Sequence, residues 1–193
     1  MKTLFLTSEK AQNKEDTFKI LRNYSEVVTH YGQFSLEFVL QNSIGAILSD
    51  RNGYIIPSEI IEAVNGRVYN THPSLLPLHR GAQPIFFAIY EKTAVGVSIH
   101  QVNSYLDKGP LVCSSEVHIA QDDTLINIYS KCRSKIIELL TENWPKMLSG
   151  SVELFDQKGK GCYHSKKEFD ELIFNLERKW QSTPQQVRNL AGP

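Results

Sequence analysis

Three polar side chains in the middle of the chain are of types that can bind and protonate a reacting group. Asn70 and His72 lie two residues apart, and Asp107 follows about 35 residues later. An amide donates hydrogen bonds, an imidazole exchanges a proton near neutral pH, and a carboxylate can orient an imidazole. An Asn-x-His pair by itself equally suits a structural histidine at a strand end. The surrounding elements must therefore decide between the two interpretations.

Strand and helix patterns alternate ahead of these residues. Apolar and β-branched runs predict strands at residues 3–6, 26–29, 44–48 and 68–69, with helices at residues 16–23, at 36–41 and after Pro57. Such alternation predicts an α/β fold, Rossmann-like, with a mostly parallel sheet flanked by helices. Ligands bind these sheets beyond the carboxyl ends of the strands. Asn70 and His72 directly follow residues 68–69, so we expect them at that edge.

The second half of the chain predicts two further strands and two helices. Residues 95–102 and 111–119 have strand patterns. Asp123 or Thr124 could cap a long helix that ends or bends at Pro145. A capping box at residues 165–168 precedes an apolar stripe, which we expect to pack on its own domain or to form a homodimer contact: Phe169, Leu172, Ile173, Leu176 and Trp180. We expect a catalytic domain at residues 1–150 and, at 151–193, a C-terminal extension packed on it.

Composition restricts the partners. Lys plus Arg and Asp plus Glu both number 21, so the formal net charge is zero, whereas nucleic-acid binding favours a basic excess. No run reaches the roughly 18 apolar residues of a membrane span. Three dispersed cysteines predict reduced thiols and a cytoplasmic location. The histidines are scattered without ligand spacing, so we expect no metal.

The motif around the polar residues resembles the catalytic region of the folate-dependent formyltransferases. This superfamily includes the glycinamide ribonucleotide, methionyl-tRNA and amino-sugar N-formyltransferases. The resemblance spans residues 44–144 and includes an Asn-x-His-Pro-Ser-Leu-Leu-Pro run, an Arg-Gly-Ala segment and a Leu-Asp-x-Gly-Pro loop. The matching residues are Asn70, His72, Pro73, Ser74, Leu75, Leu76, Pro77, Arg80, Gly81, Ala82, Leu106, Asp107, Gly109 and Pro110.

The resemblance implies a chemistry for these residues. Formyl transfer passes through a tetrahedral intermediate with negative charge on the formyl oxygen, which Asn70 and a protonated His72 can stabilise. Asp107 would steer His72 and move protons. The implied formyl donor is 10-formyltetrahydrofolate. Family resemblance places its pterin against two loops, in which the matching residues are Tyr54, Ile55, Ile56, Asn103 and Leu106. Tyr54 and Ile56 equally suit the core. Related enzymes turn sharply at Leu76-Pro77, so we expect a cis peptide there.

The departures from the family pattern bear on the acceptor. Asn70 occurs early, which implies a shortened N-terminal half, and residues 8–13 lack the glycine-rich phosphate loop of the purine enzymes. The chain is too short to include the C-terminal barrel of methionyl-tRNA formyltransferases. Short members resemble it most, which suggests a nucleotide-linked amino sugar as acceptor. The alternatives are another small amine, such as a glycinamide ribonucleotide-like substrate, or a catalytically inactive folate-binding homologue.

Overall fold

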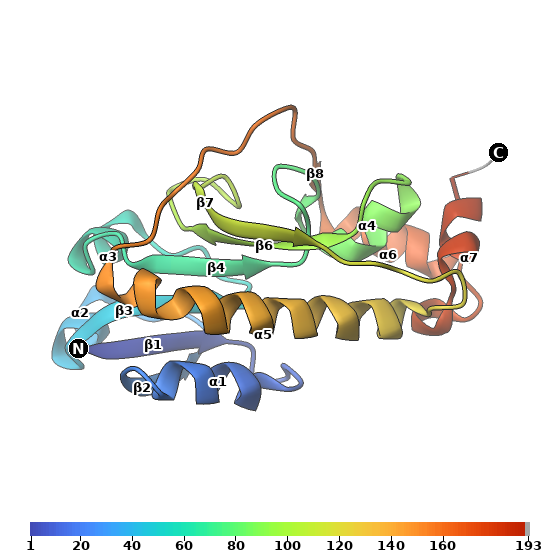
Figure 1. The fold of residues 1–193 in the computed structure, drawn as a ribbon. Coiled ribbons are helices and arrows are strands. Elements are labelled where there is room, and N and C mark those ends of the chain that lie inside the picture. The colour runs from blue at the N-terminus through green and yellow to red at the C-terminus, as the bar shows by residue number, and fades with distance from the viewer. Residues whose placement is uncertain (192–193) are drawn as a thin grey trace. The chain divides into compact units, whose positions relative to one another are not determined.

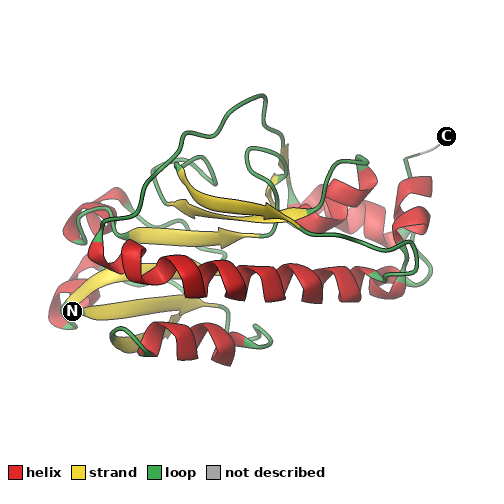
Figure 2. Ribbon diagram, in the orientation of Figure 1, coloured by secondary structure: helices red, strands yellow, loops and turns green. Residues whose placement is uncertain are grey.

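The computed structural model describes residues 1–191, which form a six-stranded sheet, a two-stranded sheet and the helices around them (Figures 1 and 2). The large sheet has the order β2-β1-β3-β4-β6-β7, and β5 pairs with β8. The strands are β1 (Lys2–Thr7), β2 (Glu26–Tyr31), β3 (Ile44–Asp50), β4 (Val68–His72), β5 (Arg80–Gly81), β6 (Gly96–Gln101), β7 (Leu111–Glu116) and β8 (Tyr163–His164).

Seven α-helices and one short 3₁₀ helix accompany the strands in the described part of the chain. They are α1 (Lys14–Arg22), α2 (Leu36–Gln41), α3 (Ser58–Ala63), α4 (Pro84–Tyr90), α5 (Leu125–Ser149), α6 (Lys166–Phe174), η1 (Lys179–Gln181) and α7 (Pro184–Asn189). None of these helices combines the length and the apolar character that crossing a bilayer requires.

The chain forms two compact units that interleave along the sequence. The first unit comprises Met1–His72, Ile99–Cys113 and Ile137–Asp156, and the second comprises Pro73–Ser98, Ser114–Ile136 and, within the described part of the chain, residues 157–191. Strands β6 and β7 and helix α5 each contribute residues to both units.

The first unit contains the parallel part of the sheet, with helices on both faces. Strand β1 pairs in parallel with β2 and β3, and β3 pairs in parallel with β4. One face packs against α2 and α3 through an apolar cluster that includes Leu4, Leu6, Val39, Ile47, Ile60 and Val68. On the other face, Thr17 of α1 donates to Asp50 of β3, and Tyr69 of β4 contacts Trp144 of α5. These contacts confirm the predicted Rossmann-like α/β arrangement.

Helix α5 does not end before Pro145, as one of the two sequence predictions had it, but continues to Ser149. A proline inside a helix removes one backbone hydrogen bond and crowds the preceding turn. Burial compensates in this last turn, because Trp144 and Met147 are fully buried. The Tyr69 hydroxyl also donates to the Met147 carbonyl over 3.1 Å, which provides that helix-end oxygen with a partner.

Strand β7 ends at Glu116, three residues before the sequence prediction. Hydrogen bonds from Gln101 N to Pro110 O and from Val117 N to Val95 O show that β6 and β7 run antiparallel. Because β6 begins only at Gly96, residues 118 and 119 have no strand opposite them. Of the two candidate caps of α5, Thr124 accepts the hydrogen bond from Asn127 N.

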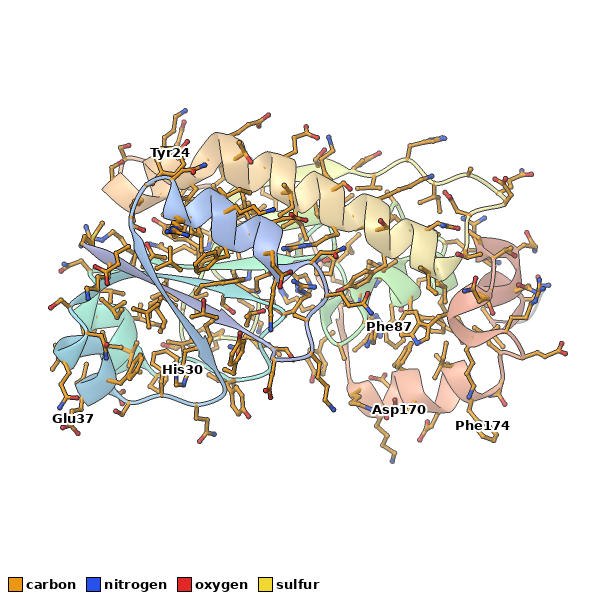
Figure 3. All side chains as sticks on the ribbon, turned by 90° about the horizontal axis from the view of Figure 1, so that it is seen from below. Tyr24, His30, Glu37, Phe87, Asp170 and Phe174 are labelled. Carbon is orange, nitrogen blue, oxygen red and sulfur yellow. The ribbon has the colours of Figure 1, made fainter. Side chains whose placement is uncertain are left out.

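The second unit is organised around the apolar helix α4. Phe86 of α4 makes an edge contact with Phe169 of α6, and Phe169 contacts Trp180. The predicted capping box of Ser165 with Glu168 begins α6, but this helix ends at Phe174, before the apolar stripe is complete. Phe169 and Leu176 are buried within the chain, whereas Trp180 remains partly exposed. Figure 3 shows Phe87 inside this unit and Phe174 at its rim. A homodimer through this stripe stays a prediction.

Candidate active site

Asn70 and His72 both belong to strand β4, near its carboxyl end, rather than to the turn that follows it. Alternate residues of a strand project from the same face, so the two side chains share one side of the sheet. Thr71 projects from the opposite side and donates to Asp50 over 2.7 Å. Asp50 is itself buried at the end of the neighbouring strand β3, and Arg51 lies 3.3 Å from it. This buried network holds the end of β4 from behind the candidate site.

Asp107 reaches the same place from the loop after β6. Its Oδ2 lies 3.8 Å from His72 Nδ1, and both side chains are largely buried. The separation is longer than a direct hydrogen bond and within the range of one bridging water. The structure therefore brings His72 and Asp107 together, as the sequence predicted.

The tight loop of Asp107 depends on Gly109. A Cβ atom on Gly109 would collide with the carbonyl oxygen of Gln101, so no side chain fits there. The loop closes through the hydrogen bond from Gln101 N to Pro110 O, and Asp107 itself adopts a left-handed backbone conformation with φ of 51°. The Asp-x-Gly-Pro spacing is thus required to fold the loop back onto β6 and direct the carboxylate toward His72.

His100, which the sequence did not single out, lies between Asn70 and Asp107. Its Nε2 lies 3.2 Å from the Asn70 amide nitrogen and 3.5 Å from Asp107 Oδ1, and its Nδ1 lies 3.0 Å from the carbonyl oxygen of Gln101. A carbonyl only accepts, so Nδ1 carries a proton. In the neutral ring Nε2 then accepts from Asn70, and in the imidazolium it donates to Asp107. The one available signal was the placement of His100 in a strand preceding the Asp107 loop.

The residues expected to contact the pterin divide into two groups. Ile56 is 4% exposed and belongs to the apolar core, so its side chain is structural. Tyr54, Ile55 and Leu106 are exposed, and Asn103 accepts a hydrogen bond from Tyr105 N. Asn52 contacts the backbone of Tyr54 through both its amide oxygen and its amide nitrogen, which shapes this loop. The Leu76-Pro77 peptide bond, in the second unit, is cis, as predicted.

The fold and the polar residues together define an α/β protein with an amide, two imidazoles and a carboxylate at the carboxyl end of its parallel strands. Residues 26–143 match the family model of the formyl transferases. The chain belongs to the formyl transferase family.

Sequence and structure comparisons find relatives with different acceptors. The structure resembles the formyltransferase PseJ from Anoxybacillus kamchatkensis, solved with UDP-4,6-dideoxy-4-formamido-L-AltNAc and tetrahydrofolate, with a TM-score of 0.85 and 28% identity, covering 99% of this chain and 100% of that one. Methionyl-tRNA formyltransferase of Coprothermobacter proteolyticus is 31% identical over 140 residues, 72% of this chain and 46% of the relative. The chain thus spans about half the length of the methionyl-tRNA formyltransferases that it matches. Phosphoribosylglycinamide formyltransferase from Bacillus halodurans shares the fold, with a TM-score of 0.66 and 20% identity, covering 78% of this chain and 94% of that one.

Proposed function

We propose that this protein transfers the formyl group of 10-formyltetrahydrofolate to the amine of a nucleotide-linked amino sugar. The observation that carries the proposal is the grouping of Asn70, His72 and Asp107 at the carboxyl end of β4. Family membership supports the reaction type. The similarity to PseJ over the length of both chains supports the class of acceptor, because that enzyme was solved with tetrahydrofolate and a UDP-linked formamido sugar.

The reaction requires charge stabilisation on one oxygen. The acceptor amine attacks the formyl carbon, so a new carbon–nitrogen bond forms and the formyl oxygen becomes negative. Asn70 and a protonated His72 project from one strand face, from which an amide N–H and the Nε2–H can both donate to that oxygen. The intermediate then collapses, the bond to N10 of the folate breaks, and the oxygen becomes a carbonyl again.

Asp107 supports the protonated state of His72 and the required proton transfer. Its Oδ2 faces His72 Nδ1, so a nearby negative charge favours the imidazolium that the oxyanion needs. The amine must lose one proton and the folate N10 must gain one, and a carboxylate beside the reacting centre can transfer it directly or through water. His100 acts as a positioning residue, because it lies within reach of both Asn70 and Asp107.

The test is turnover of 10-formyltetrahydrofolate with a panel of amines. The panel contains UDP- and dTDP-linked amino sugars, glycinamide ribonucleotide and methionyl-tRNA, and mass spectrometry detects replacement of an amine hydrogen by a formyl group. We expect product with a nucleotide-linked amino sugar. Product only with glycinamide ribonucleotide or methionyl-tRNA would replace the proposed acceptor and retain the reaction. Folate binding without any product would favour the inactive homologue.

A further inference from the structure

Four side chains with metal-ligand atoms gather in the second unit, apart from the residues proposed for formyl transfer. They are His79, Glu91, Cys162 and His164, and one ligand atom of each lies within 4.8 Å of all the others. Glu91 follows the last residue of α4, and the other three residues come together where β5 pairs with β8. Backbone hydrogen bonds from Arg80 N to Cys162 O and from Ala82 N to His164 O hold that pairing.

The distances from His79 Nδ1 to the ligand atoms of His164 and Cys162 match the edges of a tetrahedral metal site. His79 Nδ1 lies 3.3 Å from His164 Nε2 and 3.6 Å from Cys162 Sγ. Glu91 Oε1 lies 3.2 Å from His164 Nε2, and Glu91 Oε2 lies 3.8 Å from His79 Nδ1. With Zn–N bonds of about 2.05 Å and a Zn–S bond of about 2.3 Å, tetrahedral angles separate two nitrogens by about 3.3 Å, and a nitrogen from sulfur by about 3.6 Å.

The hydrogen bonds around His79 direct its lone pair toward the cluster. His79 Nε2 lies 2.7 Å from the Thr93 hydroxyl, which donates its own proton to the Ala88 carbonyl. Thr93 therefore accepts from Nε2–H, and the neutral ring has its lone pair on Nδ1. In a metal-binding histidine, the N–H of the second ring nitrogen usually donates a hydrogen bond to a nearby oxygen. Thr93 thus orients the His79 ring for metal binding through Nδ1.

Cys162 and His164 are also held in place by their neighbours. The backbone N–H of His79 donates to Cys162 Sγ over 3.0 Å, which holds the sulfur beside the His79 ring. The His164 ring stacks on Phe87 with ring centroids 3.8 Å apart, which fixes the plane of the imidazole. His79 is 1% exposed and His164 is 8% exposed, so water has little access to their ring nitrogens.

We propose that His79, Glu91, Cys162 and His164 bind one Zn²⁺ ion in a closed, structural site. Two imidazoles, one thiolate and one carboxylate complete a tetrahedron without an open position for substrate, which distinguishes a structural site from a catalytic one. A divalent cation with one thiolate and one carboxylate is electrically neutral, which suits a site with two buried histidines, a half-buried cysteine and a carboxylate at the surface. Without a metal, a proton on His164 Nε2 could form a hydrogen bond to only one neighbouring acceptor. A cation would interact with all four ligand atoms.

The ion would join parts of the second unit that are distant in the sequence. Strands β5 and β8 have two residues each, and so short a pair is marginal without further support. The metal would link residues 79 and 91 to residues 162 and 164. This proposal departs from the expectation of no metal, because residues 79 and 164 lack ligand spacing in the sequence and meet only where β5 pairs with β8.

Metal analysis of the full chain, purified without chelators, tests the proposal. We expect one zinc ion per chain by mass spectrometry of the metals, and its loss in Cys162→Ser and His164→Gln. Cys113→Ser is the matched control, because this thiol belongs to the first unit and contacts Asn143; it should retain the ion. Substoichiometric zinc in the wild-type chain that Cys162→Ser does not change would overturn the proposal.

Two further measurements test the site even if the ligand variants fail to fold. The wild-type chain, stripped of metal and reconstituted with Co²⁺, should show the intense visible absorption and thiolate charge-transfer band of four-coordinate cobalt. A weak six-coordinate spectrum without that band would contradict the site. Thr93→Val should weaken Zn²⁺ binding by about 10- to 100-fold in competition with a chromophoric chelator, while Thr93→Ser keeps it. Equal Zn²⁺ affinity in both Thr93 variants would show that the hydrogen bond from His79 to Thr93 does not support metal binding.

Discussion

At the residue scale, the candidate active site is a chain of polar contacts through His100. Asn70, His100, Asp107 and His72 follow one another at 3.2, 3.5 and 3.8 Å. Each member of this largely buried network helps to orient its neighbours. The orientation matters for the proposed reaction, because donors must be aimed in advance at the oxygen on which charge develops.

Removing either proposed oxyanion donor should reduce turnover far more than folate binding. Asn70→Ala and His72→Ala should each lower kcat by about 10²- to 10³-fold, the usual cost of losing one donor to an oxyanion. Steady-state kinetics with the acceptor found in the panel would measure it. The double variant should lose less than the product of the two single losses, because both groups act on one oxygen. Wild-type turnover in either single variant would remove that residue from the mechanism.

His100 should affect kcat without affecting folate KM, which separates a positioning role from binding. His100→Leu removes the contacts to both Asn70 and Asp107, and we expect about a tenfold fall in kcat, equivalent to one hydrogen bond. His100→Gln retains a group that can bond to Asn70 and should recover part of the loss. Equal losses in the two variants would indicate a packing role for the ring instead.

At the element scale, local packing determines the conformation of the Asp107 loop and of the segment that precedes α5. The Asp107 loop returns onto β6 so closely that only glycine fits at position 109. At the start of α5, Asp123 accepts hydrogen bonds from Lys131 and from the backbone of Ala120, both of which lower the pKa of the Asp123 carboxyl. The packing at Gly109 bears on activity, whereas the Asp123 hydrogen bonds bear on stability.

Gly109→Ala should both destabilise the chain and reduce its turnover. The added Cβ would meet the Gln101 carbonyl oxygen, so the loop must move and carry Asp107 away from His72. We expect a loss of about 1–3 kcal/mol in the free energy of unfolding, the typical cost of overpacking. Denaturant unfolding measures it, with Gly53→Ala as the stability control, since nothing lies within 4 Å of a Cβ there. Unchanged stability in Gly109→Ala would contradict the described loop.

The Asp123 contacts should stabilise the chain at neutral pH and fail in acid. A carboxyl whose pKa is lower in the folded state contributes stability above its unfolded pKa, about 3.9, and loses it as pH falls through the folded value. Asp123→Asn should therefore be less stable than wild type at neutral pH and equally stable at low pH. Asp122→Asn, at the exposed neighbouring position, should match wild type throughout. A difference independent of pH would exclude charge as its cause.

At the scale of the whole molecule, the two proposed sites belong to different compact units. The residues proposed for formyl transfer lie in the first unit, and the proposed zinc ligands lie in the second. Each unit is assembled from three separate stretches of the chain, so neither corresponds to a continuous segment. The expected division into residues 1–150 and 151–193 stays a prediction.

Folate binding should be visible as stabilisation of the whole chain. A ligand that binds only the folded state adds RT ln(1 + [L]/Kd), about 2.7 kcal/mol at a hundredfold excess over Kd. We expect 5-formyltetrahydrofolate, the unreactive isomer of the proposed donor, to raise the thermal midpoint in scanning fluorimetry. Asp107→Asn should show a similar rise, because that carboxylate acts on charge developed during the reaction. Absence of any shift and of any calorimetric binding at millimolar folate would contradict the proposed donor.

The sequence by itself determined the features that depend on neighbouring residues. Alternating apolar patterns predicted the first four strands and the helices between them, and the structure confirms them. The capping box at residues 165–168 was also readable, because it depends on residues three positions apart, and the family resemblance of the motifs around Asn70, His72 and Asp107 implied the cis bond before Pro77. Periodicity and capping reflect interactions within one or two turns or along one strand.

Only the tertiary structure decided which distant residues meet. His100 looked like an ordinary residue of an alternating strand until the packing of β4 and the Asp107 loop placed it between two site residues. Helix α5 passed Pro145 because buried side chains offset a lost hydrogen bond. The cluster of His79 and His164 joins positions 85 residues apart through strands too short to have a periodic pattern. Such contacts depend on register and packing across the fold, which no local pattern encodes.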